Sequence, residues 1–453
     1  MRYLLYTLLG LITLNSSVNS VASTKLISDQ TIDQQKKLTK KLQLKNGIPV
    51  ILRQSENSDI IHIDFNFRYG FKDQKQEAKS LSDLMFAAMT RGAKDWPKER
   101  IFQTLERYSA RIGCDMGIEN SSCQLTAVDD FLAEVLAPFA ASIQNPIFNP
   151  EDIELLRRNQ LTKLQSRRES PDFTANEMTN RIFYGNHHPY FLPIESQIKH
   201  LQSVSVEAIK KLHTELLQSH IDSIIVVSSL QEKDVLSQLE SVFGELKPGN
   251  YQAAEVPLPG RGLKQNFIFE HQSIPTAYIR IKMPMPGVTD SDFEAANLMI
   301  KVLDEELSLE IRTKRSLSYA VFSYMINYSR GIGMIGVTTS KPKETLEAIS
   351  YVIDHLKKQP LDDEELEKYK TVYATSYFLR MEDHASLASS LSRFYSYYRS
   401  VDPMYEAPKR LATLKAKDIH QLANKYLTNF KMGVVFERKN FKDEWAERFL
   451  KKH

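Results

Sequence analysis

The chain has 453 residues, and its 59 Lys and Arg against 56 Asp and Glu leave a net charge of only +3. So small a charge does not favour nucleic acid or an anionic membrane surface as the main partner. The length and the hydrophobic content of 42% predict an ordinary globular protein with at least two domains.

The N-terminus has the three-part layout of a secretory signal peptide. A basic residue precedes the apolar run Leu4 to Leu14, and a small polar stretch follows that ends at Val21-Ala22-Ser23. We expect residues 1–23 to be removed; a buried N-terminal helix is the alternative. No later stretch approaches about 18 apolar residues, so we expect a periplasmic or secreted protein without stable membrane insertion.

Cys114 and Cys123 are the only cysteines. If residues 117–120 form the turn of a hairpin, the two thiols face each other across the strands, and an oxidising compartment permits a disulfide there. Two unpaired thiols are the alternative, and the sequence leaves the choice open. A Cys-His nucleophile is not favoured, because no histidine lies nearby in the sequence.

Two halves of the chain begin alike, with an offset of about 215 residues. Each has two stretches typical of strands, then a polar loop, then a long amphipathic helix, and each closes with a late strand. In the first half these elements are expected at 42–52, 61–67, 79–90 and 221–228. In the second half the strands are expected at 266–271 and 277–283, the loop at 284–290, the helix at 292–309 and the late strand at 431–437.

This duplication predicts an α+β protein of two homologous domains, each a mainly antiparallel sheet with helices on one face. The Pro- and Gly-rich stretch 248–262 is typical of a linker. We therefore expect domains at 28–247 and 263–453.

Four stretches carry a family resemblance. Leu44 to Leu52 contains a Leu-x-Asn-Gly hairpin, and 78–92 is a helix that ends at a glycine. Residues 184–190 contain a His-Pro-Tyr turn, and Arg312 and Tyr319 form an Arg-x6-Tyr pair. Together with the duplication, the whole mature chain resembles a subunit of the pitrilysin/insulinase peptidases, which include the core proteins of the respiratory cytochrome bc1 complex.

Active members of that family bind zinc through H-x-x-E-H on the first helix and a Glu on a later helix. Counted back from the glycine that ends the helix, the motif positions fall on Asp83, Phe86 and Ala87, and the later Glu falls near Thr162 and Lys163. None of these can take the zinc-binding role, and the chain has no H-x-x-E-H or H-E-x-x-H. The resemblance therefore implies a degenerate motif, with no metal or other cofactor in this chain.

The histidines give no other metal site. The adjacent pair His187 and His188 precedes a proline and is interpreted as a turn element. His213 and His220 lie on or just beyond an amphipathic helix expected at 205–217, and we expect both to be solvated. There is also no Gly-rich phosphate loop and no G-x-S-x-G motif, so nucleotide binding and serine hydrolysis lack support.

The resemblance gives Arg312 and Tyr319 catalytic roles. A guanidinium offers forked donors to a substrate carbonyl, and a phenol can donate to the oxyanion that forms when a peptide carbonyl is attacked. Arg312 would then position the substrate and Tyr319 would stabilise the tetrahedral intermediate. The alternatives are a surface Arg at a helix end and a core Tyr at the start of a strand.

The presence of this pair and the absence of a zinc motif predict the zinc-less subunit of a two-chain periplasmic peptidase. A partner with H-x-x-E-H, in a heterodimer or a larger assembly, would supply zinc, and the substrates would be unfolded or short peptides. Alone, the chain is expected to be inactive. The alternative is a non-catalytic scaffold or peptide-binding protein of the same fold, comparable to the respiratory core proteins. A self-sufficient peptidase with another metal site ranks last.

Overall fold

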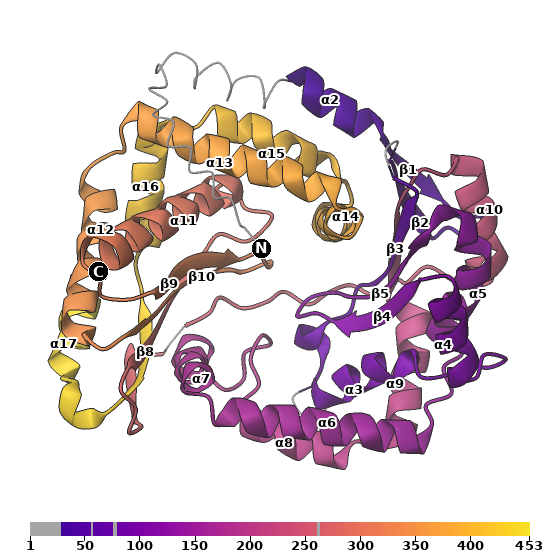
Figure 1. Ribbon diagram of the computed structural model, residues 1–453, viewed down its shortest axis with the longest axis horizontal. Helices are drawn as coiled ribbons and strands as arrows, with labels where there is room; N and C mark the ends of the chain where they lie inside the picture. Colours follow the sequence, from indigo (N-terminus) through magenta and orange to yellow (C-terminus); the bar gives the residue numbers. More distant parts are fainter. Residues whose placement is uncertain (1–28, 56–57, 76–78, 261–262) are drawn as a thin grey trace, which may run out of the picture.

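The computed structural model describes residues 29–55, 58–75, 79–260 and 263–453. The expected signal peptide, residues 1–23, lies outside the described residues. The described chain forms two sheets with helices around them (Figure 1). None of the helices described is both long and apolar enough to cross a membrane.

The first sheet has the strand order β1-β2-β6-β3-β5-β4. All neighbouring strands are antiparallel except the parallel pair β2 and β6. The strands are β1 (Thr39–Gln43), β2 (Pro49–Gln54), β3 (Ile60–Phe67), β4 (Arg111–Met116), β5 (Ser121–Val128) and β6 (Ile221–Ser228). The helices of this half are α2 (Asp29–Lys37), α3 (Lys79–Met89), α4 (Lys98–Arg107), α5 (Leu132–Gln144), α6 (Pro150–Arg168), α7 (Pro171–Tyr184), α8 (Ile194–Ser203), α9 (Val206–Ser219) and α10 (Glu232–Phe243).

The second sheet has the order β7-β11-β8-β10-β9, again with one parallel pair, β7 and β11. Its strands are β7 (Phe267–His271), β8 (Ala277–Met285), β9 (Ala320–Ile326), β10 (Gly331–Thr339) and β11 (Lys431–Phe436). The helices are α11 (Phe293–Leu307), α12 (Pro342–Lys358), α13 (Asp363–Glu382), α14 (His384–Tyr398), α15 (Asp402–Ala412), α16 (Ala416–Tyr426) and α17 (Asp443–Lys452). Apart from the extra β1, both halves have the same topology, so the predicted duplicated α+β fold class is confirmed.

Local sequence explains where several elements begin and turn. The side chain of Asn149 caps α6 and that of Ser170 caps α7, and a proline occupies the first turn of both helices. The turn between β1 and β2 contains Gly47 with φ of +91°, a conformation that favours glycine. The predicted loop at 284–290 begins too early, because β8 continues through Pro284, which lies opposite Ile332 of β10.

Each half has its own apolar core between its sheet and its helices. In β5 the buried residues alternate with half-buried ones, as expected for a sheet with one core face. In β3 every residue after Ile60 is buried, so the prediction of a half-buried strand is wrong. The polar residues His62, Asp64 and Asn66 are buried because a helix covers the second face of the sheet.

That helix comes from the other half of the chain. α14 packs on β3 and β6 of the first sheet, and α7 packs on β8 and β11 of the second, so the halves exchange one helix each (Figure 1). A Cβ on Gly433 of β11 would lie 2.8 Å from the carbonyl oxygen of Ala175 on α7. Only glycine therefore allows α7 to pack this closely. The exchange ties the two sheets into one framework.

Candidate functional site

The Arg-x6-Tyr motif begins on an unusual helical turn. α11 continues into a π-helix, Ser308–Lys314, that carries Arg312. The buried carboxylate of Glu310 in this turn accepts a hydrogen bond from Nε of Arg315 at 2.7 Å and lies 3.4 Å from Nζ of Lys314. π-helical turns are rare and often occur at functional sites. Here the turn fixes the backbone on which the Arg312 side chain stands.

The loop that follows is held by its backbone and small side chains. The N–H of Leu317 donates to the carbonyl of Ile311 at 2.8 Å, and Oγ of Ser318 donates to the carbonyl of Thr338 at 2.7 Å. Ser316 takes a left-handed conformation with φ of +50°. This frame positions Tyr319 directly before β9, which is an edge strand of the second sheet.

Arg312 and Tyr319 are both presented to solvent. Tyr319 exposes 91% of its surface, which excludes the alternative of a core tyrosine. Arg312 is also exposed, and among the described residues neither side chain has a hydrogen bond or an ion pair. The guanidinium and the phenol are therefore free to bind another molecule.

The degenerate zinc positions lie on α3, which packs on α6, α8, α9 and β4. Phe86 is buried in the core, with its ring centroid 6.0 Å from that of Phe67. Ala87 is half-buried and offers no ligand atom, and Asp83 is exposed. None of the three side chains that the family motif requires is kept: Asp83 stands at the first His position, Phe86 at the Glu position and Ala87 at the second His position.

Positive charge lies where a metal would need ligands. Solvent reaches Asp83, but the surrounding protein desolvates its carboxylate and raises its pKa to about 6. The positive charges of Lys163 and Arg167 on α6 act in the opposite direction and lower this pKa. Within the part of the chain that the structure describes, no group of three or more His, Cys, Asp or Glu could hold a metal ion. The residues at this position do not fit a zinc ion.

The structure does not bring the two motif regions together. The π-helix with Arg312 packs on α11, α12 and β9 of the second half, while α3 with Asp83 packs within the first half. The π-helical turn that carries Arg312 and the degenerate zinc positions therefore lie in different halves of the described chain.

The predicted turn histidine has a structural role. Nε2 of His188 donates to the carbonyl of Pro257 at 3.0 Å, and its Nδ1 accepts the N–H of Tyr190 at 3.1 Å. The prediction that His213 and His220 are solvated is wrong, because both are buried. Burial lowers the pKa of each, and His213 bonds a backbone carbonyl at 2.8 Å. The buried face of α9 therefore includes His213 in addition to the aliphatic residues Ile209, Leu212 and Leu216.

Cys114 and Cys123 are joined by a disulfide. They lie directly opposite each other on β4 and β5, with the turn at 117–120 between these strands. Cys123 has no exposed surface. The bond therefore closes the hairpin that contains the edge strand β4 of the first sheet.

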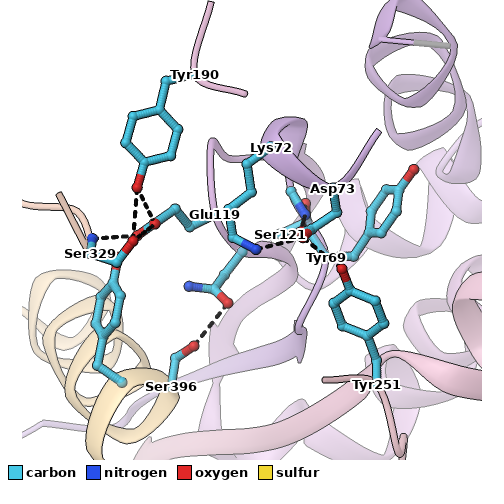
Figure 2. A network of polar contacts seen from close by, with 12 residues as sticks. Tyr69, Lys72, Asp73, Glu119, Ser121, Tyr190, Tyr251, Ser329 and Ser396 are labelled. Atoms are coloured by element: carbon cyan, nitrogen blue, oxygen red, sulfur yellow. Dashed lines mark hydrogen bonds and ion pairs between the residues drawn. The ribbon is translucent and has the colours of Figure 1, made fainter. Parts of the chain in front are cut away.

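The turn of this hairpin carries a polar junction that sequence reasoning missed. Glu119, only 4% exposed, accepts hydrogen bonds from the hydroxyls of Tyr190, Ser329 and Tyr397, and from the N–H of Ser329 at 2.9 Å (Figure 2). Burial, together with the negative charge of Glu119, raises the pKa of both tyrosines. Ser329 and Tyr397 belong to the second half, so Glu119 joins the halves.

A second carboxylate, that of Asp73, forms hydrogen bonds and an ion pair near the same hairpin turn. Asp73 accepts the N–H of Gly70 at 2.9 Å and the hydroxyl of Tyr251 at 2.8 Å, and it forms an ion pair with Lys72 (Figure 2). Tyr251 lies in the connection between the halves. Because the carboxylates of Glu119 and Asp73 already bind neighbouring side chains and backbone groups, we interpret both clusters as structural.

Comparison with known proteins finds similarity to the M16 peptidases. Residues 203–373 match the model of the "Peptidase M16 inactive domain". The zinc protease PqqE of Helicobacter pylori is 18% identical over 412 residues, which cover 87% of this chain and 91% of that protein.

Two solved structures share the fold. The peptidase M16 inactive domain from Pseudomonas fluorescens gives a TM-score of 0.79 at 18% identity, over 88% of this chain and 98% of that one. The periplasmic protease PqqL from Escherichia coli gives a TM-score of 0.76 at 16% identity, over 88% of this chain but 46% of that one. The predicted family resemblance is thus confirmed: the chain has the fold of the M16 peptidases, and residues 203–373 match the inactive domain of that family.

Proposed function

We propose that this chain is the zinc-less subunit of a two-chain periplasmic peptidase. It would contribute Arg312 and Tyr319, and a partner with H-x-x-E-H would contribute the metal. The observation that carries the proposal is the exposure of Tyr319 on a loop that is held by the hydrogen bonds of Leu317 and Ser318. An exposed aromatic residue buries little surface within this chain, but it suits contact with a second molecule.

Chain length supports an assembly of two such units. This chain aligns with less than half of the E. coli periplasmic protease, while it aligns with almost the full length of the P. fluorescens protein. A single chain of this length therefore corresponds to one half of the longer enzyme. The periplasmic location that we propose agrees with that neighbour, with the expected signal peptide and with the disulfide.

The proposed substrate is an unfolded or short peptide. β4 and β9 are edge strands, so among the described strands each has one row of backbone donors and acceptors that no neighbouring strand pairs. A peptide in extended conformation can add to such an edge through main-chain hydrogen bonds. Tyr319 directly precedes β9, so a peptide that the partner presents near this edge would meet the phenol.

The test is reconstitution. The tagged mature chain is recovered under mild conditions from its native compartment, and the chains that copurify are identified by mass spectrometry. We expect a stoichiometric partner with H-x-x-E-H, and hydrolysis of an unstructured peptide by the mixture but by neither chain alone. Recovery without such a partner would favour the non-catalytic scaffold or peptide-binding protein. Zinc-dependent hydrolysis by this chain alone would contradict both proposals.

A further inference from the structure

A cavity in the second half of the chain is not used by the proposed function. It lies between α11, α13, α14 and α15 and has a volume of about 580 Å³. Volumes of this size are typical of small-molecule sites. Its lining combines two arginines, Arg380 and Arg393, with aromatic and thioether side chains and the amide of Asn327.

The two arginines lack an anionic partner. Among the described residues, neither Arg380 nor Arg393 forms a hydrogen bond or an ion pair, and Nε of Arg393 is buried. The carboxylate of Glu294 in the same lining is already paired with Arg410 outside it. Oδ1 of Asn327 is likewise buried and unpartnered. The cavity thus holds unmatched positive charge and unmatched polar atoms.

Arg380 and Arg393 line the same cavity, and their like charges repel each other. The pKa of Arg393 is lowered first by burial and further by the positive charge of Arg380. Neighbouring charges of one sign cost free energy unless an opposite charge lies with them. An anion with two acceptor oxygens would satisfy both guanidinium groups, since Arg binds carboxylates through its forked donors.

The rest of the lining favours an apolar body on that anion. The side chains of Met381, Leu387, Phe394 and Met404 line the cavity, together with the ring of Tyr373. Apolar side chains of this kind gain free energy when they bury hydrocarbon surface, whereas a bare inorganic anion would leave them unused. The site therefore selects for a ligand with one charged end and one apolar end.

We propose that this cavity binds a small organic carboxylate with an apolar or aromatic body, whose charged group is held by Arg380 and Arg393. A free fatty or aromatic acid and the C-terminus of a short peptide share this chemistry. The site lies within one chain and needs no partner subunit, so it stands or falls separately from the proposed peptidase role.

Binding is measured by isothermal titration calorimetry on the mature chain, with octanoate, N-acetyl-Leu-Phe and N-acetyl-Leu-Phe amide as probes. We expect at least one acid to bind and the amide to bind at least ten-fold more weakly, because the amide lacks the charge. Arg380→Gln and Arg393→Gln should each weaken acid binding by about ten-fold or more. Arg107→Gln on α4, outside the cavity, is the matched control and should bind like the unmodified chain.

Binding of octanoate alone would identify free acids as the source, and binding of the dipeptide acid alone would identify peptide termini. If Arg393→Gln fails to fold, Arg380→Gln decides, because Arg380 is exposed and its loss leaves no core contact unfilled. The proposal is overturned if neither acid binds, if the amide binds as well as its acid, or if Arg380→Gln binds with unchanged affinity.

Discussion

Among the large hydrophobic side chains described, Tyr319 is the most exposed. The neighbouring residues Leu317 and Ser318 are buried, whereas the ring of Tyr319 points into solvent. An exposed tyrosine contributes little to stability. A substitution at Tyr319 can therefore test its proposed role in catalysis without a large change in the free energy of unfolding.

Tyr319→Phe tests the proposed role of the phenol. With the zinc-bearing partner present, we expect kcat for peptide hydrolysis to fall about ten-fold or more, as for the loss of one oxyanion donor, with an unchanged Tm. Tyr351→Phe, which removes another exposed hydroxyl in the same half, should leave kcat unchanged. An unchanged kcat in Tyr319→Phe would remove this residue from the chemistry.

Lys282, in contrast to the exposed Tyr319, is an ionisable residue that is buried in the protein. It is 3% exposed on β8, contacts Asn180 of α7, and its Nζ lies 5.7 Å from the ring centroid of Tyr184. Burial lowers its pKa to about 7. Between pH 7 and 10 the unfolded chain therefore binds more protons at this group than the folded chain, so its contribution to stability rises with pH.

Lys282→Met removes the free-energy cost of burying the protonated lysine. We expect the variant to be more stable than the unmodified chain by about 1–4 kcal/mol at pH 6–7. The difference should shrink as pH rises from 7 toward 10, because the folded chain has released the lysine proton and the unfolded chain gains progressively less from holding it. Urea unfolding across this pH range measures it. A difference that stays constant with pH would show that Lys282 does not change protonation on folding.

At the scale of elements, the hairpin of β4 and β5 is both a sheet edge and the support of Glu119. The disulfide between Cys114 and Cys123 crosses it, nine residues apart in the sequence. Cross-links stabilise mainly by restricting the unfolded chain, and a short loop gives a modest effect. The bond therefore holds an edge strand that, among the described strands, pairs with β5 alone.

Replacing both cysteines with alanine should lower the free energy of unfolding by about 2–3 kcal/mol. The same loss is expected when the unmodified chain is unfolded in the presence of a reductant. The double variant is the control for reductant effects, since it should respond to none. Equal stability of the oxidised chain and the double variant would show that the bond adds nothing to this hairpin.

At the scale of the whole molecule, the two halves are held by exchanged helices and by buried charge. α7 and α14 each cover the sheet of the other half, and Glu119 of the first half accepts bonds from Ser329 and Tyr397 of the second. Removing one partner of such a cluster leaves the others buried without a bond, which costs more than the loss of a surface pair.

Glu119→Ala should therefore destabilise the chain by about 3–5 kcal/mol and weaken the coupling of the halves. The two tryptophans allow this to be seen, because Trp96 packs on the first core and Trp445 on the second. In single-tryptophan variants, the two unfolding transitions should coincide in the unmodified background and separate with Glu119→Ala. Glu255→Ala, at an exposed ion pair, should cost less than about 1 kcal/mol and leave the transitions together.

Much of the fold could be predicted because its signals are local. β6 runs over the predicted residues 221–228, and the expected helix at 79–90 differs from α3 by one residue. The helix expected at 292–309 divides into α11 and a π-helix, a change of hydrogen bonding that apolar periodicity does not reveal. Pro284 looked like a loop residue, yet it continues β8, because the strand gains more from packing than one missing N–H costs.

The sequence by itself revealed the repeated order of elements and the degenerate zinc motif, because both depend on residue types at fixed spacings. The secretory N-terminus remains an expectation from the same kind of pattern. Tertiary structure decided which helix covers which sheet, why His213 is buried and why Tyr319 is not. It also decided the partners of Glu119, which lie 210 and 278 residues away. No local pattern encodes such contacts, since they arise only where the two halves of the chain exchange helices and bury the polar groups between them.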